Sequence, residues 1–194
     1  MPLLRNNMLY CEHLGASVND AHDIENFSIK DVRGAGLLNY IKNFAFDDEA
    51  HKRMRTYLVR ANNSLELTGY FSLKAGLISF NESNENEIAN FDTLPGIELA
   101  NFAVNKEYLD KNPNAKGLGL LIFNDFILPI VRDVSERVGV EVLYLYIFAL
   151  PFDGLIRQYG KYGFLRLPAE REDELHKRLK PRYDSECIFM YQML

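Results

Sequence analysis

The 194-residue sequence has few cysteines, few histidines and no cluster of metal-ligating side chains. Its two cysteines, Cys11 and Cys187, lie near opposite ends and form no CxxC pair, which argues against a disulfide framework or a thiolate metal site. The histidines are scattered without the spacing of metal ligands. We therefore expect reduced thiols and no bound metal.

Long apolar runs are also missing. A helix that crosses a bilayer needs roughly 20 apolar residues, and the longest candidate, Leu118 to Val131, is interrupted by two polar residues and by Pro129. The N-terminal stretch lacks the charged, apolar and small-residue succession of a signal peptide. We expect no membrane partner and a cytoplasmic location.

What is present is the composition of a globular protein. Hydrophobic residues make up 47% of the chain and charged residues 25%, which fits one domain over residues 1–194 with an N-terminal extension over 1–40. Lys and Arg number 22 against 27 Asp and Glu, a net charge of −5. This sign disfavours a nucleic acid partner, because phosphate backbones are bound by cations.

The N-terminal half predicts one helix and a hairpin. Segment 46–59 begins with acids and continues with bases, which favours a helix, and Phe44 and Phe46 are expected to anchor it to the sheet. Leu65 to Phe80 is rich in aromatic and β-branched residues and predicts two strands with a tight connection near Lys74 to Gly76.

The C-terminal half predicts alternating strands and helices, and hence an α/β or α+β fold with helices on the faces of a sheet. The expected elements are a polar loop over 81–94, a strand over 96–104, a helix over 118–138 weakened at Pro129, a buried strand over 140–150, a helix over 152–163, a strand over 164–167, a charged surface helix over 168–182 and a strand over 187–194.

A polar loop with two glycines precedes the helix in NPNAKGLGLLIF. The first amides of a helix have no partner within it and favour an anion, and Gly117 and Gly119 would let the backbone approach a phosphate. The spacing matches neither the P-loop nor the dinucleotide fingerprint. These residues alone leave two interpretations open, a phosphate cradle or a turn that begins a helix.

Four stretches, LANFAV, NAKGLG, VEVLYLYIFA and YGKYGF, together resemble the successive motifs of the GNAT superfamily of acyl-CoA N-acyltransferases, over Gly96 to Leu194. The resemblance implies a mixed, mostly antiparallel sheet of about six to seven strands and acetyl-CoA as the cosubstrate. The residues that would meet acetyl-CoA are the main chain of Phe102, Ala103 and Val104, which would pair with pantetheine, and the pyrophosphate motif on Asn114, Ala115, Lys116, Gly117, Leu118 and Gly119.

This chain departs from the family pattern at three places. Asn114 stands where Gln or Arg is usual, the connection before it is several residues longer, and Gln158 replaces an aromatic residue. The first two departures fall on the cofactor-binding segment.

The resemblance assigns catalysis to the YGKYGF helix. Tyr159 would be the general acid for the departing thiolate, with Tyr162 as its structural partner. For the general base, Glu98 is the first candidate, with Glu66 and His51 behind it. Substitution of Tyr159 by Phe should reduce turnover more than cofactor binding.

The implied function is transfer of an acetyl group to a primary amine of a small molecule, peptide or aminoacyl group. The stretch GYFSL is similar to a GNAT subgroup that includes toxin–antitoxin acetyltransferases, so an aminoacyl-tRNA substrate and an antitoxin partner stay open, and a basic groove near Lys52, Arg53, Arg55 and Arg60 would support them. A non-catalytic CoA-binding module is a further alternative. The terminal strand CIFMYQML offers an edge for a homodimer.

Overall fold

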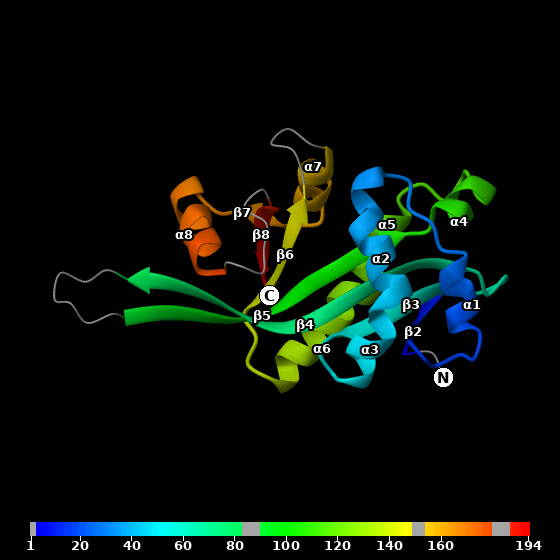
Figure 1. Ribbon diagram of the computed structural model, residues 1–194, viewed down its shortest axis with the longest axis horizontal. Helices are drawn as coiled ribbons and strands as arrows, with labels where there is room; N and C mark the ends of the chain where they lie inside the picture. Colours follow the sequence, from blue (N-terminus) through cyan, green and yellow to red (C-terminus); the bar gives the residue numbers. More distant parts are fainter. Residues whose placement is uncertain (1–2, 83–89, 149–153, 180–186) are drawn as a thin grey trace. The chain divides into compact units, whose positions relative to one another are not determined.

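The computed structural model describes residues 3–82, 90–148, 154–179 and 187–194. The chain divides into two compact units, the first made of Met1–Lys74 and Leu99–Ile130 and the second of Ala75–Glu98 and Val131–Leu194. Two long strands, β4 (Leu67–Glu82) and β5 (Asn90–Val104), contribute to both units (Figure 1).

The first unit combines short N-terminal strands with helices from both parts of the chain. Its elements besides β4 and β5 are β1 (Leu4–Arg5), β2 (Leu9–His13), α1 (Asp20–Glu25), the 3₁₀ turn η1 (Val32–Gly34), α2 (Ala35–Asn43), α3 (Ala45–Ala50), β3 (Arg55–Ala61), α4 (Lys106–Lys111), α5 (Leu118–Ile122) and the π-helical turn η2 (Phe123–Ile127). The helix α6 (Leu128–Arg137) begins in this unit and continues into the second.

The second unit holds β6 (Val142–Phe148), α7 (Gly154–Lys161), β7 (Leu165–Arg166), α8 (Ala169–Leu179) and β8 (Cys187–Met193). The strands form one eight-stranded sheet in the order β1-β2-β3-β4-β5-β6-β8-β7. Among the strand pairs whose register is described, only β5 with β6 is parallel. The predicted mixed, mostly antiparallel sheet is confirmed, with slightly more strands than expected.

Helices cover both faces of the strands in the first unit. The helices α1, α2 and α3 lie on one face of β3 and β4 (Figure 1), where Ile24, Ile41 and Leu58 share a buried core with Tyr70. The Tyr70 hydroxyl donates to the Leu37 carbonyl at 2.7 Å. Because neighbouring strand residues point to opposite faces, the adjacent Gly69 faces the other side, towards Ile122 of α5.

Most of the C-terminal predictions are confirmed in type and place over the described residues. The apolar run at 140–150 is β6, five of whose seven residues are buried. The helix predicted over 118–138 runs from Leu118 to Arg137, and its π-helical turn ends two residues before Pro129, which cannot donate a backbone hydrogen bond. None of the helices in the described ranges is both long enough and apolar enough to span a bilayer.

The predicted hairpin at Leu65 to Phe80 is wrong, because β4 runs unbroken through it. Gly76 does not turn the chain but makes room: a Cβ there would lie 1.8 Å from the Tyr144 hydroxyl oxygen. The predicted loop at 81–94 is also partly wrong, since β4 extends to Glu82 and β5 begins at Asn90. The rest of that segment, 83–89, lies outside the described residues.

The predicted helix at 46–59 is too long. Helix α3 ends at Ala50 and β3 begins at Arg55, after Lys52 has reversed the chain with a φ of 58°. The strand is dictated by burial, since six of its seven residues are buried. The role expected of Phe44 and Phe46 as anchors is wrong as well, because they are 53% and 42% exposed.

Strand β8 pairs with β6 along its whole length and with β7 at Met190 and Tyr191. On the β7 side, the buried Glu172 carboxylate accepts a hydrogen bond from the Phe189 amide at 2.8 Å and pairs with Arg166 at 2.7 Å. Part of this edge is therefore already occupied, and a homodimer through β8 stays a prediction.

Candidate active site

The predicted pantetheine segment is the last part of β5. The parallel register of β5 with β6 covers Gly96 to Glu98, so the main chain of Phe102 to Val104 lies beyond it. Ala103 is buried in the core of the first unit, whereas Phe102 and Val104 are half-buried. The strand is held at its end by the Asn105 amide, which donates to the Thr68 carbonyl at 2.8 Å.

The lengthened connection after β5 folds as helix α4. Its N-cap is Asn105, whose side-chain oxygen accepts from the Glu107 amide at 3.2 Å and from the Ser28 amide at 3.3 Å, while its nitrogen donates to the Leu67 carbonyl at 2.8 Å. A buried cap of this kind satisfies helix amides that would otherwise lack a partner. The extra residues therefore form an ordered helix in front of the glycine loop.

The glycine loop itself is exposed and begins α5. Gly117 has a φ of 80°, and a Cβ built on it would find nothing within 4 Å. Asn114 and Lys116 are exposed, while Leu118 is buried and fixes the first residue of the helix. The amides of the first helical turn have no carbonyl one turn earlier to accept their hydrogen bonds. This loop therefore offers an anionic ligand backbone amide donors, unobstructed access and the Lys116 cation.

The predicted general acid, Tyr159, is buried in the second unit. Its ring packs edge-on against Tyr162 and Phe164, at 5.5 Å and 5.7 Å between centroids. Burial, and to a smaller extent the neighbouring Tyr162, raises the pKa of the Tyr159 phenol, so the hydroxyl keeps its proton at neutral pH. Within the part of the chain that the structure describes, the Tyr159 hydroxyl makes no hydrogen bond.

Gln158, the departure from the family pattern, has a local role. Its side-chain nitrogen donates to the Tyr162 hydroxyl at 2.6 Å. Tyr162, which directly follows α7, is thus bonded to a residue of that helix. This distinguishes the two tyrosines, because the Tyr162 hydroxyl is held by Gln158 whereas the Tyr159 hydroxyl is available for another partner.

The three candidate bases are in different environments. Glu98 is 6% exposed in β5 and accepts a hydrogen bond from the Tyr144 hydroxyl of β6. Glu66 is exposed and pairs with Lys111 at 3.2 Å. His51 is exposed at the end of α3 and pairs with Asp47 at 3.0 Å. Burial and a specific partner therefore distinguish Glu98 from the other two, and its contact with Tyr144 is one that the sequence did not indicate.

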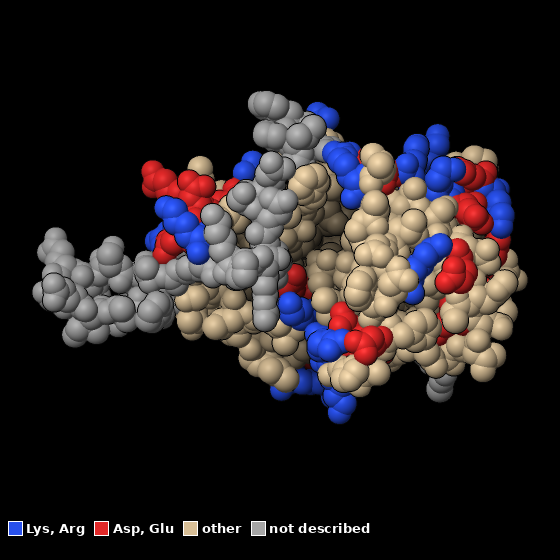
Figure 2. All heavy atoms as spheres, in the orientation of Figure 1, with Lys and Arg blue, Asp and Glu red and all other residues tan. Residues whose placement is uncertain are grey.

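The basic groove that would support an aminoacyl-tRNA substrate does not form among the described residues, because its arginines are paired. Arg53 contacts Asp47 and lies 2.6 Å from Asp48, and Arg55 lies 2.5 Å from Glu49. Figure 2 accordingly shows acidic and basic side chains side by side around α3. The exposed arginines are close to neutralised at this place.

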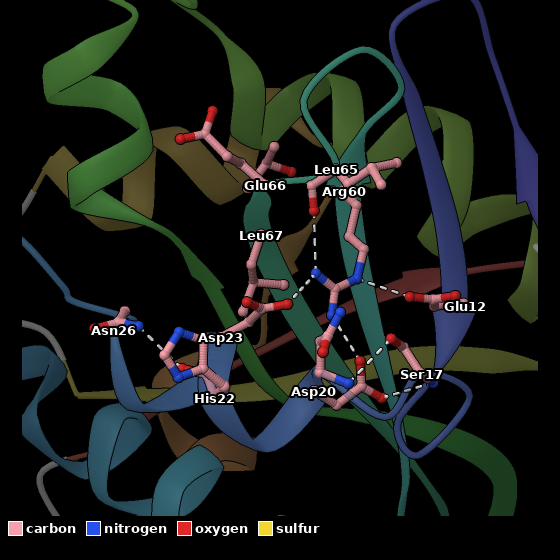
Figure 3. A network of polar contacts seen from close by, with 12 residues as sticks. Glu12, Ser17, Asp20, His22, Asp23, Asn26, Arg60, Leu65, Glu66 and Leu67 are labelled. Atoms are coloured by element: carbon pink, nitrogen blue, oxygen red, sulfur yellow. Dashed lines mark hydrogen bonds and ion pairs between the residues drawn. The ribbon is translucent and has the colours of Figure 1, made fainter.

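Arg60 is buried inside the first unit and contributes nothing to its surface. Its side chain is 4% exposed, and its guanidinium donates to Glu12 at 2.7 Å, to Asp20 and Asp23 at 2.6 Å each, and to the Leu65 carbonyl at 3.1 Å (Figure 3). One cation thus joins β2, α1 and the turn between β3 and β4. Its role is structural.

No protein-family model matches the sequence, but solved structures do. A tyrosine-to-phenylalanine variant of the AtaT toxin, bound to the C-terminus of the antitoxin AtaR and acetyl-CoA, matches with a TM-score of 0.59 at 17% identity, over 95% of this chain and 92% of that one. AtaT complexed with acetyl-methionyl-tRNAfMet matches with a TM-score of 0.57 at 18% identity, over 93% of each chain.

A tyrosine-to-phenylalanine variant of KacT matches with a TM-score of 0.63 at 17% identity, over 94% of each chain. Nearly the whole length of this chain follows that of the toxins. The chain therefore has the fold of the AtaT toxin and of KacT, in agreement with the fold that its GNAT-like sequence motifs predicted.

Proposed function

We propose that this protein is an acetyltransferase that moves an acetyl group from acetyl-CoA to a primary amine. The observation that carries the proposal is the exposed loop at Gly117, where a positive φ, an open approach and the start of a helix coincide. A structural neighbour with acetyl-CoA bound supports the assignment.

The chain offers two segments to the cosubstrate. The amides around Gly117 to Gly119 would hold the pyrophosphate, because a helix N-terminus favours an anion and the glycines leave the backbone accessible. Lys116 adds a charge, and Asn114 would supply an amide side chain where the family has a longer one. The main chain of Phe102 to Val104 would pair with the pantetheine as an added strand.

In the chemical step, the acceptor ammonium loses a proton to Glu98. The neutral nitrogen then forms a bond to the thioester carbonyl carbon, and a main-chain amide near Phe102 to Val104 stabilises the developing oxyanion. The carbon–sulfur bond breaks with its electron pair on sulfur, and the Tyr159 phenol gives its proton to the thiolate. Tyr159 recovers a proton as the product nitrogen loses its second one, and Glu98 then releases its proton to solvent.

The test combines calorimetry with steady-state kinetics for two matched variants, Tyr159→Phe and Tyr162→Phe. We expect the first to lower kcat by roughly 100-fold or more and to leave acetyl-CoA affinity within about twofold. The second should change kcat little, because that hydroxyl is held by Gln158. Lack of acetyl-CoA binding by folded protein at millimolar concentration would sink the proposal, and binding without turnover on a broad amine panel would indicate a non-catalytic module.

Two structural neighbours favour a narrower function. One is complexed with acetyl-methionyl-tRNAfMet, and the other is bound to the C-terminus of its antitoxin. We propose as the second candidate that the acceptor is the amine of an aminoacyl-tRNA and that an antitoxin protein is the partner. Transfer of labelled acetyl to charged tRNA tests it directly. Expression without growth arrest, together with no label on tRNA, would rule it out in favour of a smaller amine.

A further inference from the structure

Tyr144 is buried beside the proposed general base. It lies on β6 directly opposite Glu98 in the parallel register with β5, and the two residues are 5% and 6% exposed. The Tyr144 hydroxyl donates a hydrogen bond to the Glu98 carboxylate. A buried carboxylate is costly unless its oxygens accept hydrogen bonds, and this contact provides one such hydrogen bond.

Two glycines make the space that Tyr144 occupies. A Cβ at Gly76 would lie 1.8 Å from the Tyr144 hydroxyl oxygen, and a Cβ at Gly96 would lie 2.9 Å from its ring. Both are far inside ordinary contact distance, so neither β4 nor β5 tolerates a side chain there. The space at Gly76 accommodates the hydroxyl of Tyr144 itself. A phenylalanine at position 144 would not need this space.

The ring is also fixed on its other sides. Tyr144 packs against Phe189 of β8 at 5.8 Å and against Tyr146 of β6 at 6.0 Å between centroids. A ring confined by three strands has few alternative orientations. Packing therefore fixes the hydroxyl in the space at Gly76, and the hydrogen bond to Glu98 is made from this fixed position, in the manner of a group that orients a functional carboxylate.

We propose that Tyr144 is a positioning residue that holds the Glu98 carboxylate in one orientation for removal of a proton from the acceptor amine. The proposal rests on the proposed function, in which Glu98 is the base. Tyr144 acts through Glu98 and need not touch either substrate.

The kinetic test is a double-mutant cycle of Tyr144→Phe and Glu98→Gln, with calorimetry of acetyl-CoA for every variant. In the wild-type background we expect Tyr144→Phe to lower kcat/KM for the amine by roughly tenfold, as for loss of one hydrogen bond to a charged group, with acetyl-CoA affinity unchanged. In the Glu98→Gln background it should cost nothing further. Tyr191→Phe is the control, because Tyr191 of β8 lies directly opposite Tyr144 of β6, and its substitution should leave the rate unchanged.

An equal loss in both backgrounds would overturn the proposal, since Tyr144 would then act without Glu98. A second readout does not need activity: the ionisation of Tyr144, followed by NMR of protein labelled at the tyrosine ring carbon and assigned with Tyr144→Phe. Burial raises the pKa of Tyr144 first, and the charge and hydrogen bond of Glu98 raise it further, so Glu98→Gln should let Tyr144 ionise at lower pH.

The two measurements distinguish failure of the Tyr144–Glu98 contact from failure of the proposed enzyme function. An ionisation that does not respond to Glu98→Gln overturns the contact itself. A response by NMR without acetyl transfer by any variant overturns the enzyme proposal and the kinetic role of Tyr144 with it.

Discussion

Replacement of Arg60 by Met should destabilise the protein severely without touching its chemistry. The substitution keeps an apolar stem of similar length but removes four hydrogen bonds, three of them to carboxylates. Asp20, whose side chain is 1% exposed, would be left buried without a cation. Asp23 can turn to solvent, because its side chain is 29% exposed.

The magnitude follows from these burials. Removing one partner of a buried ion pair typically costs about 3 to 5 kcal/mol of stability. We use this range and not the sum over the three ion pairs, because Asp23 is partly exposed and water can replace its lost partner. Because a domain is stable by only about 5 to 15 kcal/mol, the variant should lose a large part of its stability. At roughly 2 to 4 °C per kcal/mol, the Tm would fall by about 6 to 20 °C.

Urea denaturation followed by circular dichroism measures this cost. Arg55→Met is the matched control, since Arg55 is half exposed on the same strand and pairs with Glu49; we expect a loss below about 1 kcal/mol. Arg60→Lys should fall between the two, because it keeps the charge and loses the planar fork. An Arg60→Met variant within about 1 kcal/mol of wild type would refute the structural role given to this network.

Two further predictions concern the cofactor loop and alkaline pH. Gly117→Ala places a methyl group at a φ of 80°, which costs about 1 to 2 kcal/mol of strain. It should weaken acetyl-CoA binding in calorimetry, whereas the control Gly139→Ala should not. Equal affinities of the two variants would contradict a pyrophosphate cradle at Gly117. Burial, with smaller contributions from Cys11 and Glu49, raises the pKa of Tyr57 to about 12 from 10.0. The folded state therefore holds this proton more tightly, and the stability it contributes is present below pH 10 and lost as pH rises towards 12. Tyr57→Phe should make urea stability decline less steeply over that window, by up to about 1.4 kcal/mol per pH unit, and identical slopes would show that Tyr57 does not titrate there.

Elements whose formation depends on local pattern could be predicted from the sequence. Three elements have a pattern that is contained in their own residues: the apolar run that becomes β6, the helix from Leu118 and the charged helix α8. The same holds for the glycine loop and the tyrosine motif, because each motif is a short contiguous stretch. Their positions along the chain were therefore correct, and the fold followed from their order.

Elements that depend on distant partners could not be predicted in this way. The charges after α3 favour a helix locally, but the following residues are buried as β3 by the helices packed on them. In the sequence, Arg60 interrupts an apolar strand and has the pattern of a surface cation. In the structure it is buried among three carboxylates from β2 and α1. In both cases tertiary contacts override local preference.

Gly76 illustrates the same limit at the candidate site. A glycine inside a strand pattern has two physical explanations, a turn or a close approach by another group, and sequence favours the turn when no partner is known. The group that approaches is the Tyr144 hydroxyl, which in turn contacts Glu98. The glycine that seemed to end a strand thus marks the space beside the proposed base. The sequence placed Glu98 ahead of Glu66 and His51, although none of the three stands in a motif. What distinguishes Glu98 in the structure is a neighbour on another strand, Tyr144, and not a feature of its own segment.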